Sequence, residues 1–236
     1  MKKKIFSFLL AICLIIPAMF AMTACDDPEN PPVDTNIYVS TQEQLFDAVS
    51  DTSENTIVLT QNIEIDRQIT VRKKVTIDLN GKEIFNTQDI WDNTEGIKEW
   101  ALISVQGNGD LTITGNGTLS AKENDCHAVD VRENGKVTIK NGTIIGNVSS
   151  VYLIENATAI IEGGTYDIKQ LSSSNGYNML LNIYDGDNGQ FIVKGGSFKK
   201  YNPSNCPSES PSISFVPEGY QTTENGEYFV VSKIAE

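Results

Sequence analysis

The strongest constraint on the fold is an internal repeat that runs through the body of the 236-residue chain. Each copy holds a short apolar strand, a turn rich in Asn and Gly, a second short strand, a Gly, a Thr or Ser, and a large apolar residue. The glycines that mark successive copies are spaced by 36, 25, 22 and 32 residues and stand at positions 81, 117, 142, 164 and 196. A unit of about twenty-odd residues in two or three alternating strands is the size of one solenoid coil, which buries its apolar set only when neighbours stack.

The sequence before and within these repeats resembles a known superfamily. Residues 40–49, 56–59 and 75–81, followed by the repeated coils, are similar to the start of many pectate-lyase-like right-handed parallel β-helices. The resemblance covers roughly residues 37–203 and implies an all-β fold, a right-handed parallel β-helix solenoid of about five to six coils. The superfamily holds lyases, hydrolases, epimerases, adhesins and phage spikes, so the resemblance does not choose a function.

Both ends of the predicted solenoid carry signals for a cap. Ser40-x-x-Glu43 reads as a capping box that opens a short helix, and Leu45, Ala48 and Val49 share one face of that helix. Residues 219–231 read as a β-hairpin. We expect the N-terminal helix and the C-terminal hairpin to cover the first and last coils, because an uncovered coil leaves unpaired strand edges.

The N-terminus predicts export and lipidation. Residues 1–24 combine three Lys with an apolar run and read as a lipoprotein signal peptide, and the small residues before Cys25 resemble the lipobox of bacterial lipoproteins. An uncleaved anchor or ordinary secretion remains an alternative. Residues 25–36 form an acidic Pro-rich tether, and residues 37–236 form the β-helix domain with its caps. We therefore expect an extracytoplasmic protein, lipid-anchored to the bacterial cell envelope through Cys25, with the leaflet left open.

The charge balance excludes several classes of partner. The chain has 31 acidic and 18 basic residues, a net charge of −13, and removal of the three signal-peptide Lys brings it nearer −16. Nucleic acids and anionic membrane surfaces attract Lys and Arg clusters, so neither is an expected partner of the body. We expect a monomer whose contact with the membrane is the lipid anchor.

Aligning the coils on their turns separates the inward and outward faces of one strand in each repeat. Ile103, Val129, Val151 and Leu181 stack inward, as do Val105, Val131, Leu153 and Ile183. The outward columns are then Ser104–Asp130–Tyr152–Asn182 and Gln106–Arg132–Ile154–Tyr184. Aromatic faces beside charged hydrogen-bonding groups suit sugar rings, so Tyr152, Tyr184, Asp130 and Arg132 are candidate ligand-binding residues on an exposed sheet. A solvated surface ladder without a ligand is the alternative.

Both tryptophans of the chain, Trp91 and Trp100, lie in the 85–100 segment between two repeats. A loop of that length inside a solenoid is often functional. The two indoles are therefore either a stacking platform for a glycan or anchors that hold the loop against the coils.

Catalysis is weakly supported by the sequence. A polysaccharide lyase needs a basic group and carboxylates or Ca²⁺ beside a uronate, and Arg132 with Asp130 is the available pair. A hydrolase needs clustered carboxylates, which the sequence does not provide. Asp185-Gly-Asp187-Asn-Gly189 departs from a Ca²⁺ loop and reads as a corner turn, so no metal or cofactor is expected outside the lyase alternative, for which Ca²⁺ is possible.

Three residues outside these columns also bear on the function. His127 falls in the inward register at a strand start and reads as a packed or corner residue. Cys126 and Cys206 are the thiols left in the body, and a disulfide between them is open because it requires the C-terminal segment to fold back along the solenoid.

These observations favour a cell-envelope lipoprotein that acts as a glycan-binding or adhesion module for a glycan or another surface component. The alternatives are a small polysaccharide lyase acting on uronic-acid polymers and a purely structural surface solenoid.

Overall fold

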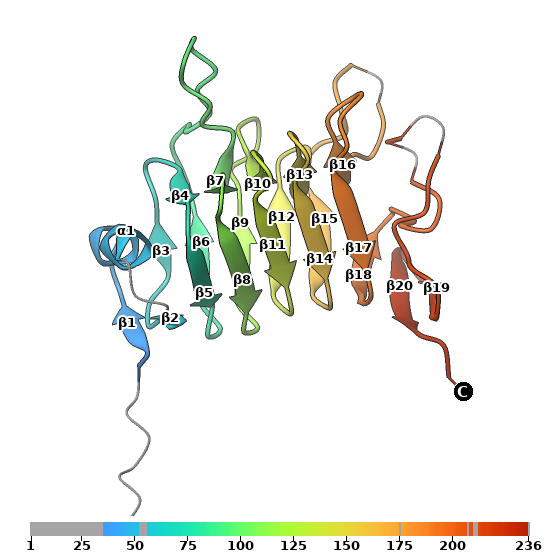
Figure 1. The fold of residues 1–236 in the computed structure, drawn as a ribbon, viewed down its shortest axis with the longest axis horizontal. Helices are drawn as coiled ribbons and strands as arrows, with labels where there is room; N and C mark the ends of the chain where they lie inside the picture. The colour runs from blue at the N-terminus through green and yellow to red at the C-terminus, as the bar shows by residue number, and fades with distance from the viewer. Residues whose placement is uncertain (1–34, 52–55, 175, 207, 210–211, 236) are drawn as a thin grey trace, which may run out of the picture. The chain divides into compact units, whose positions relative to one another are not determined.

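The computed structural model describes residues 35–51, 56–174, 176–206, 208–209 and 212–235. The predicted signal peptide, Cys25 and the tether up to Asp34 lie outside the described residues. Within these residues the chain folds mainly into strands, which form three sheets. Strands from successive repeats lie side by side along the molecule (Figure 1). No helix in the described ranges combines the length and apolarity needed to cross a membrane.

Each sheet collects one strand from each successive repeat. In the described part of the chain, sheet A has seven strands in the order β1 (Ile37–Val39), β2 (Thr56–Leu59), β5 (Lys74–Asp78), β8 (Asp110–Thr114), β11 (Lys136–Ile139), β14 (Thr158–Ile161), β17 (Gln190–Val193). Sheet B has eight, in the order β3 (Ile63–Glu64), β6 (Glu83–Phe85), β9 (Thr118–Ser120), β12 (Thr143–Gly146), β15 (Thr165–Ile168), β18 (Gly196–Lys199), β20 (Tyr228–Lys233), β19 (Tyr220–Asn225). Sheet C has five, in the order β4 (Ile69–Val71), β7 (Ala101–Val105), β10 (His127–Val131), β13 (Val151–Leu153), β16 (Leu181–Ile183).

Successive strands visit the sheets in the order A, B, C, from β2–β3–β4 to β14–β15–β16, and β17 and β18 continue the series. Neighbouring strands from successive triplets pair in parallel, as a stacked solenoid requires. The repeat read from the sequence therefore corresponds to a repeating structural unit, and the fold is consistent with an all-β solenoid.

The core consists of ladders of apolar side chains, one step for each repeat. In sheet C the inward ladders pair as the alternation predicts, with Val129 between Ile103 and Val151 and Val131 between Val105 and Leu153. All six of these side chains are fully buried. Burying a Val, Leu or Ile side chain contributes about 1.5–3 kcal/mol, so the ladders supply the main stabilising free energy of the fold.

The sharp corners between sheets C and A use left-handed backbone, as the Asn-rich turns predicted. Glu133 and Asn134 have φ of 56° and 65°, and Glu155 and Asn156 in the next repeat have φ of 59° and 61°. Asn adopts this conformation more readily than most residues, which accounts for its recurrence at these corners.

The helix α1 (Gln42–Ser50) begins one residue later than the predicted capping box. Its N-cap is Thr41, whose hydroxyl accepts a hydrogen bond from the Gln44 amide at 3.3 Å, while the Gln44 side chain accepts from the Ser40 amide at 2.8 Å. The prediction that Ser40 and Glu43 form the capping box was wrong by one residue. Ser40 and Thr41 are both suitable N-cap residues and stand next to each other, and the helix uses Thr41. Leu45, Ala48 and Val49 are buried on one face, as expected.

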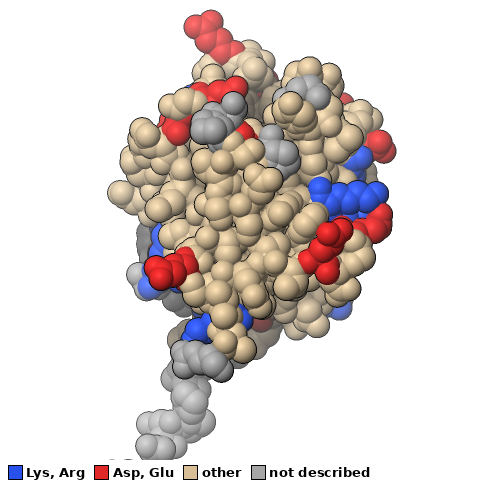
Figure 2. All heavy atoms as spheres, turned by 90° about the vertical axis from the view of Figure 1, so that its right-hand side faces the viewer, with Lys and Arg blue, Asp and Glu red and all other residues tan. Residues whose placement is uncertain are grey.

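The C-terminal end pairs differently from the rest. Strand β20 adds to β18 in the antiparallel sense, and β19 pairs antiparallel with β20 as the predicted hairpin. The centre of this end of the molecule is largely uncharged, with acidic groups towards its periphery (Figure 2). Cys126 and Cys206 are both buried and free, so no disulfide joins them.

The close packing between repeats predicts that Gly117→Ala is strongly destabilising. A Cβ at Gly117 would lie 2.0 Å from the carbonyl oxygen of Lys82, whereas a Cβ at Gly186 meets nothing within 4 Å. We expect Gly117→Ala to lower the free energy of unfolding by about 3 kcal/mol or more, and Gly186→Ala by about 1 kcal/mol through its left-handed backbone alone. Urea unfolding followed by circular dichroism measures both, and equal losses would contradict this packing.

Candidate functional site

A loop of residues 86–100, between β6 and β7, crosses the outer face of sheet C. Its first half is fixed by the buried carboxylate of Asp125. That carboxylate accepts hydrogen bonds from the Trp91 amide at 2.9 Å, the Ile90 amide at 3.2 Å and the Asn86 side-chain amide at 2.6 Å. Hydrogen bonds to a carboxylate are stronger than those between neutral groups, so this residue pins the loop to the repeat that follows it.

The second half of the loop is held by another buried polar side chain, Gln68. Its amide oxygen accepts hydrogen bonds from the amides of Trp100 at 3.0 Å and Ala101 at 3.3 Å. Within the loop, Asp92 and Glu99 pair through their backbones as an antiparallel bridge. The two ends and the stem of the loop are therefore all fixed by hydrogen bonds.

The loop places both tryptophans in one aromatic cluster. Trp91 and Trp100 stack with their ring centres 5.8 Å apart and their planes 14° apart. Trp100 meets Tyr152 edge to face at 6.3 Å, and Tyr152 stacks on His127 at 4.8 Å. Trp91 closes the cluster by an edge contact with His127 at 5.8 Å. Trp91 is compatible with both roles considered above. It packs in the cluster and so anchors the loop, and it keeps 43% of its surface exposed as a possible stacking platform.

The charged pair of the outward columns is buried beneath this cluster. Arg132 donates a hydrogen bond to Asp130, and the two residues are 2% and 0% exposed. The guanidinium of Arg132 lies 4.5 Å from the centre of a Trp100 ring, a cation–π contact. Burial lowers the pKa of Arg132, against the attraction of Glu155 and Glu133.

The sequence therefore placed these side chains in the correct columns but with the wrong exposure. Asp130 pairs with Ser104 and Tyr152, and Tyr152 with Asn182, as the alignment of coils predicted. The expected exposed face is instead covered: Tyr152 is 9% exposed, and burial raises its pKa to about 12. Tyr184, beyond the end of β16, is 52% exposed as expected.

His127 also departs from its predicted place. The alternation of the strand put its side chain inward, yet its ring stacks on Tyr152 outside the core ladders. It is the first residue of β10, where the chain is still turning out of a corner, so the two-residue period of the strand does not fix its direction.

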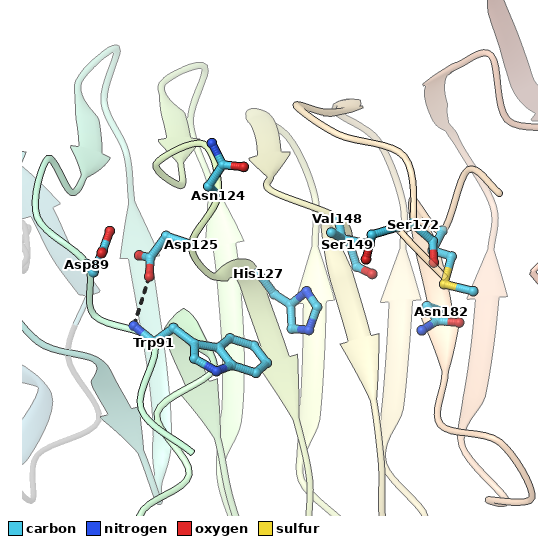
Figure 3. A pocket seen from close by; sticks show the side chains of 11 residues that line it. Asp89, Trp91, Asn124, Asp125, His127, Val148, Ser149, Ser172 and Asn182 are labelled. Carbon is cyan, nitrogen blue, oxygen red and sulfur yellow. Dashed lines mark hydrogen bonds between the residues drawn. The ribbon is translucent and has the colours of Figure 1, made fainter. Parts of the chain in front are cut away.

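A pocket of about 490 Å³ opens beside the cluster. Its walls include the loop residue Trp91, the strand residues His127 and Asn182, and two further residues, Ser149 and Ser172 (Figure 3). This volume lies in the range typical of small-molecule sites. Asn124, Asp125, Asp89, Val148, Ser173 and Met179 complete the lining.

Two buried polar atoms at this pocket have no hydrogen-bond partner in the described structure: the hydroxyl oxygen of Ser149 and Nδ1 of His127. Burial of such a group without a partner costs about 1–3 kcal/mol, so native proteins seldom leave it unpaired. Burial lowers the pKa of His127 to about 4, with a further contribution from the positive charge of Arg132, so its ring is neutral near pH 7.

Comparison of the chain with models of known protein families, with curated proteins and with solved structures gave no significant match. The function must therefore be argued from the site itself.

The described residues show no arrangement typical of a metal centre, since they contain no group of three or more His, Cys, Asp or Glu placed to hold an ion. The 185–189 segment is a corner turn, as predicted. The Asp187 carboxylate accepts hydrogen bonds from the amides of Glu155, Asn156 and Asn188, which lower its pKa.

Three residues that build the site were not found by the sequence reasoning: Asp125, Gln68 and Ser149. Each lies just outside a strand and has no place in the repeated columns. Polarity is the one feature of the sequence that could have pointed to them. Asp125 and Ser149 are polar residues that stand two positions before the strands β10 and β13.

We expect Asp125→Ala to release the first half of the loop while the coils stay folded. Three donors lose their acceptor, each at a cost of about 1 kcal/mol or more. The tryptophan emission should shift to longer wavelength and become more accessible to a neutral quencher, with the far-ultraviolet circular dichroism unchanged.

Asp89→Ala is the matched control, because Asp89 is a loop acid whose side chain is 70% exposed and pairs only at the surface with Lys122, at 2.7 Å. It should leave the emission as in the wild type. Identical spectra for the two variants would contradict the anchoring role of Asp125.

The depressed pKa of His127 makes a prediction about acid stability. Between about pH 6.5 and pH 4 the unfolded chain binds a proton on His127 that the folded chain does not, so this group lowers the free energy of unfolding as the pH falls through that window. His127→Phe keeps an aromatic ring against Tyr152 and removes the titration of the one histidine in the chain. Urea unfolding at several pH values should show a smaller acid loss in the variant. Parallel pH profiles would argue against a neutral, buried His127.

Proposed function

We propose that this protein is a glycan-binding or adhesion module of a bacterial cell envelope. The observation that carries the proposal is the pocket at Trp91, where a partly exposed indole lies beside the uncharged polar side chains of Ser149 and Asn182 and the ring of His127. Sugar rings have an apolar C–H face that packs on an aromatic ring and hydroxyl groups at their rim, so both features of the pocket suit them.

The binding role is divided among the residues of the site. Trp91 supplies the stacking face, and His127 and Ser149 supply hydrogen bonds from the floor. Trp100, Tyr152, Arg132 and Asp130 support that floor from beneath, because Tyr152 stacks on His127 and Trp100 stacks on Trp91. Tyr184 is exposed on the same sheet and extends the contact surface for a longer glycan.

The proposal includes the fold and the location that fit such a role. We propose a right-handed, pectate-lyase-like coil of five to six turns, since parallel crossover connections are almost always right-handed. A monomer tethered through lipidated Cys25 would hold this binding face outside the cytoplasm, where glycans and other surface components are found.

The lyase alternative has one observation in its favour. Arg132 lines a separate cavity of about 450 Å³, together with Arg72 and Lys98. Against it, Arg132 is 2% exposed and hydrogen-bonded to Asp130, which hinders approach to a substrate proton. Incubation with uronic-acid polysaccharides and Ca²⁺, followed by ultraviolet absorbance of unsaturated products, tests this alternative directly.

The binding proposal predicts that Trp91→Ala lowers glycan affinity by about tenfold or more, since removal of a central aromatic contact costs over about 1 kcal/mol. A glycan array identifies ligands of the wild type, and calorimetry with the best of them compares the variants. Tyr38→Ala is the matched control, because Tyr38 is an exposed aromatic residue of β1, in another sheet, and 56% accessible.

Equal affinities of the two variants would remove the pocket from the binding site. An array without binding above background would overturn the proposed function itself and favour a purely structural solenoid.

A further inference from the structure

We infer that the Trp91 pocket accepts an uncharged sugar and discriminates against uronate and sulfated sugars. This inference rests on the proposed function and specifies its ligand class. The charges and the hydrogen-bonding groups that line the pocket support this inference.

The lining residues of the pocket include no Lys or Arg. The described lining residues with an acidic side chain are Asp89, which is exposed, and Asp125, which is buried. Asp89 forms an ion pair with Lys122 at 2.7 Å, so this lysine is already engaged with an acid of the loop. An anionic ligand therefore meets no free positive charge there.

His127 does not supply the missing charge. Its ring is held between Tyr152 and Trp91, and the cation of Arg132 lies behind the same cluster. Burial and that neighbouring charge lower its pKa to about 4, so it faces the pocket as a neutral hydrogen-bonding group at physiological pH.

The negative charge of Asp125 does not make the pocket a site for a positively charged amino sugar either. Its two carboxylate oxygens already accept hydrogen bonds from the Ile90 and Trp91 amides and from the Asn86 side chain. The carboxylate serves to hold the loop, and 9% of the residue is exposed.

The groups left for a ligand are uncharged. The side chains of Ser149, His127 and Asn182 line this space with uncharged polar groups (Figure 3). Val148, Met179 and the indole of Trp91 provide the apolar wall. An uncharged pyranose combines hydroxyl groups with an apolar face and matches both sets.

A carboxylate or sulfate ester in this pocket would lose part of its hydration without gaining a counter-ion, which disfavours binding. The net charge of −13 adds a weaker, long-range repulsion. Both effects act in the same direction, and the local one is the larger because salt screens the other.

The first experiment uses the full chain on an array with three matched arms: uncharged, uronate-containing and sulfated oligosaccharides. We expect binding that depends on Trp91 to be confined to the uncharged arm. Binding of uronate or sulfated sugars as tightly as uncharged ones, and lost in Trp91→Ala, would overturn the inference while leaving the proposed function intact. Binding in no arm would overturn both.

The second experiment adds a charge to a ligand that binds. Oxidation of the primary hydroxyl groups of the best uncharged oligosaccharide gives a uronate of the same linkage, and its affinity should fall about tenfold or more. An unchanged affinity would overturn the inference.

A variant that adds a positive charge to the pocket tests whether the discrimination against anionic sugars arises there. Ser173 is an exposed residue that lines the pocket, and Ser232, exposed on β20 of sheet B, does not. Ser173→Lys should restore binding of the oxidised ligand, and Ser232→Lys should restore it much less, although both change the net charge equally. An equal gain in both variants, or a gain in neither, would overturn the assignment of the discrimination to this pocket.

Discussion

The buried carboxylate of Asp125 is the interaction on which the site depends. It accepts hydrogen bonds from two consecutive backbone amides of the 86–100 loop, at Ile90 and Trp91, and from Asn86 at the start of that loop. Without these bonds the backbone at Ile90 and Trp91 loses its attachment to the following repeat, and the pocket wall that Trp91 forms loses that support. The function that we propose is thus a consequence of one acid placed at the entry to a strand.

The solenoid explains why such a loop can be added at little cost. Each repeat pairs with its neighbours through its strands, so an insertion between β6 and β7 leaves the ladders of the core in register. The long outer face of sheet C then becomes a floor for whatever the loop places on it. Here the loop places two stacked indoles there and buries Asp130 and Arg132.

The repeat, the two inward ladders of sheet C and the pairing of Asp130 with Tyr152 could be predicted from sequence, because a strand has a period of two and the turns align the copies. The exposure of Tyr152 could not, since it depends on a loop that returns over the sheet. The anchors of that loop were missed for the same reason: Asp125 contacts residues 34 to 39 positions away, and Gln68 contacts residues 32 and 33 positions away. These contacts occur once and do not recur from repeat to repeat, so they leave no periodic trace.

We propose that hydrogen bonds hold the 86–100 loop in place and that a sugar enters the pocket beside it. The indole N–H signals of the two tryptophans test both statements at once. The chain has two tryptophans, so two signals are expected in a nitrogen–proton correlation spectrum, assigned with Trp91→Phe. We predict two well-dispersed signals in the free protein and a shift of the Trp91 signal on titration with an uncharged oligosaccharide that binds. Two overlapping signals at the position of an unfolded chain, unmoved by that ligand, would contradict this prediction.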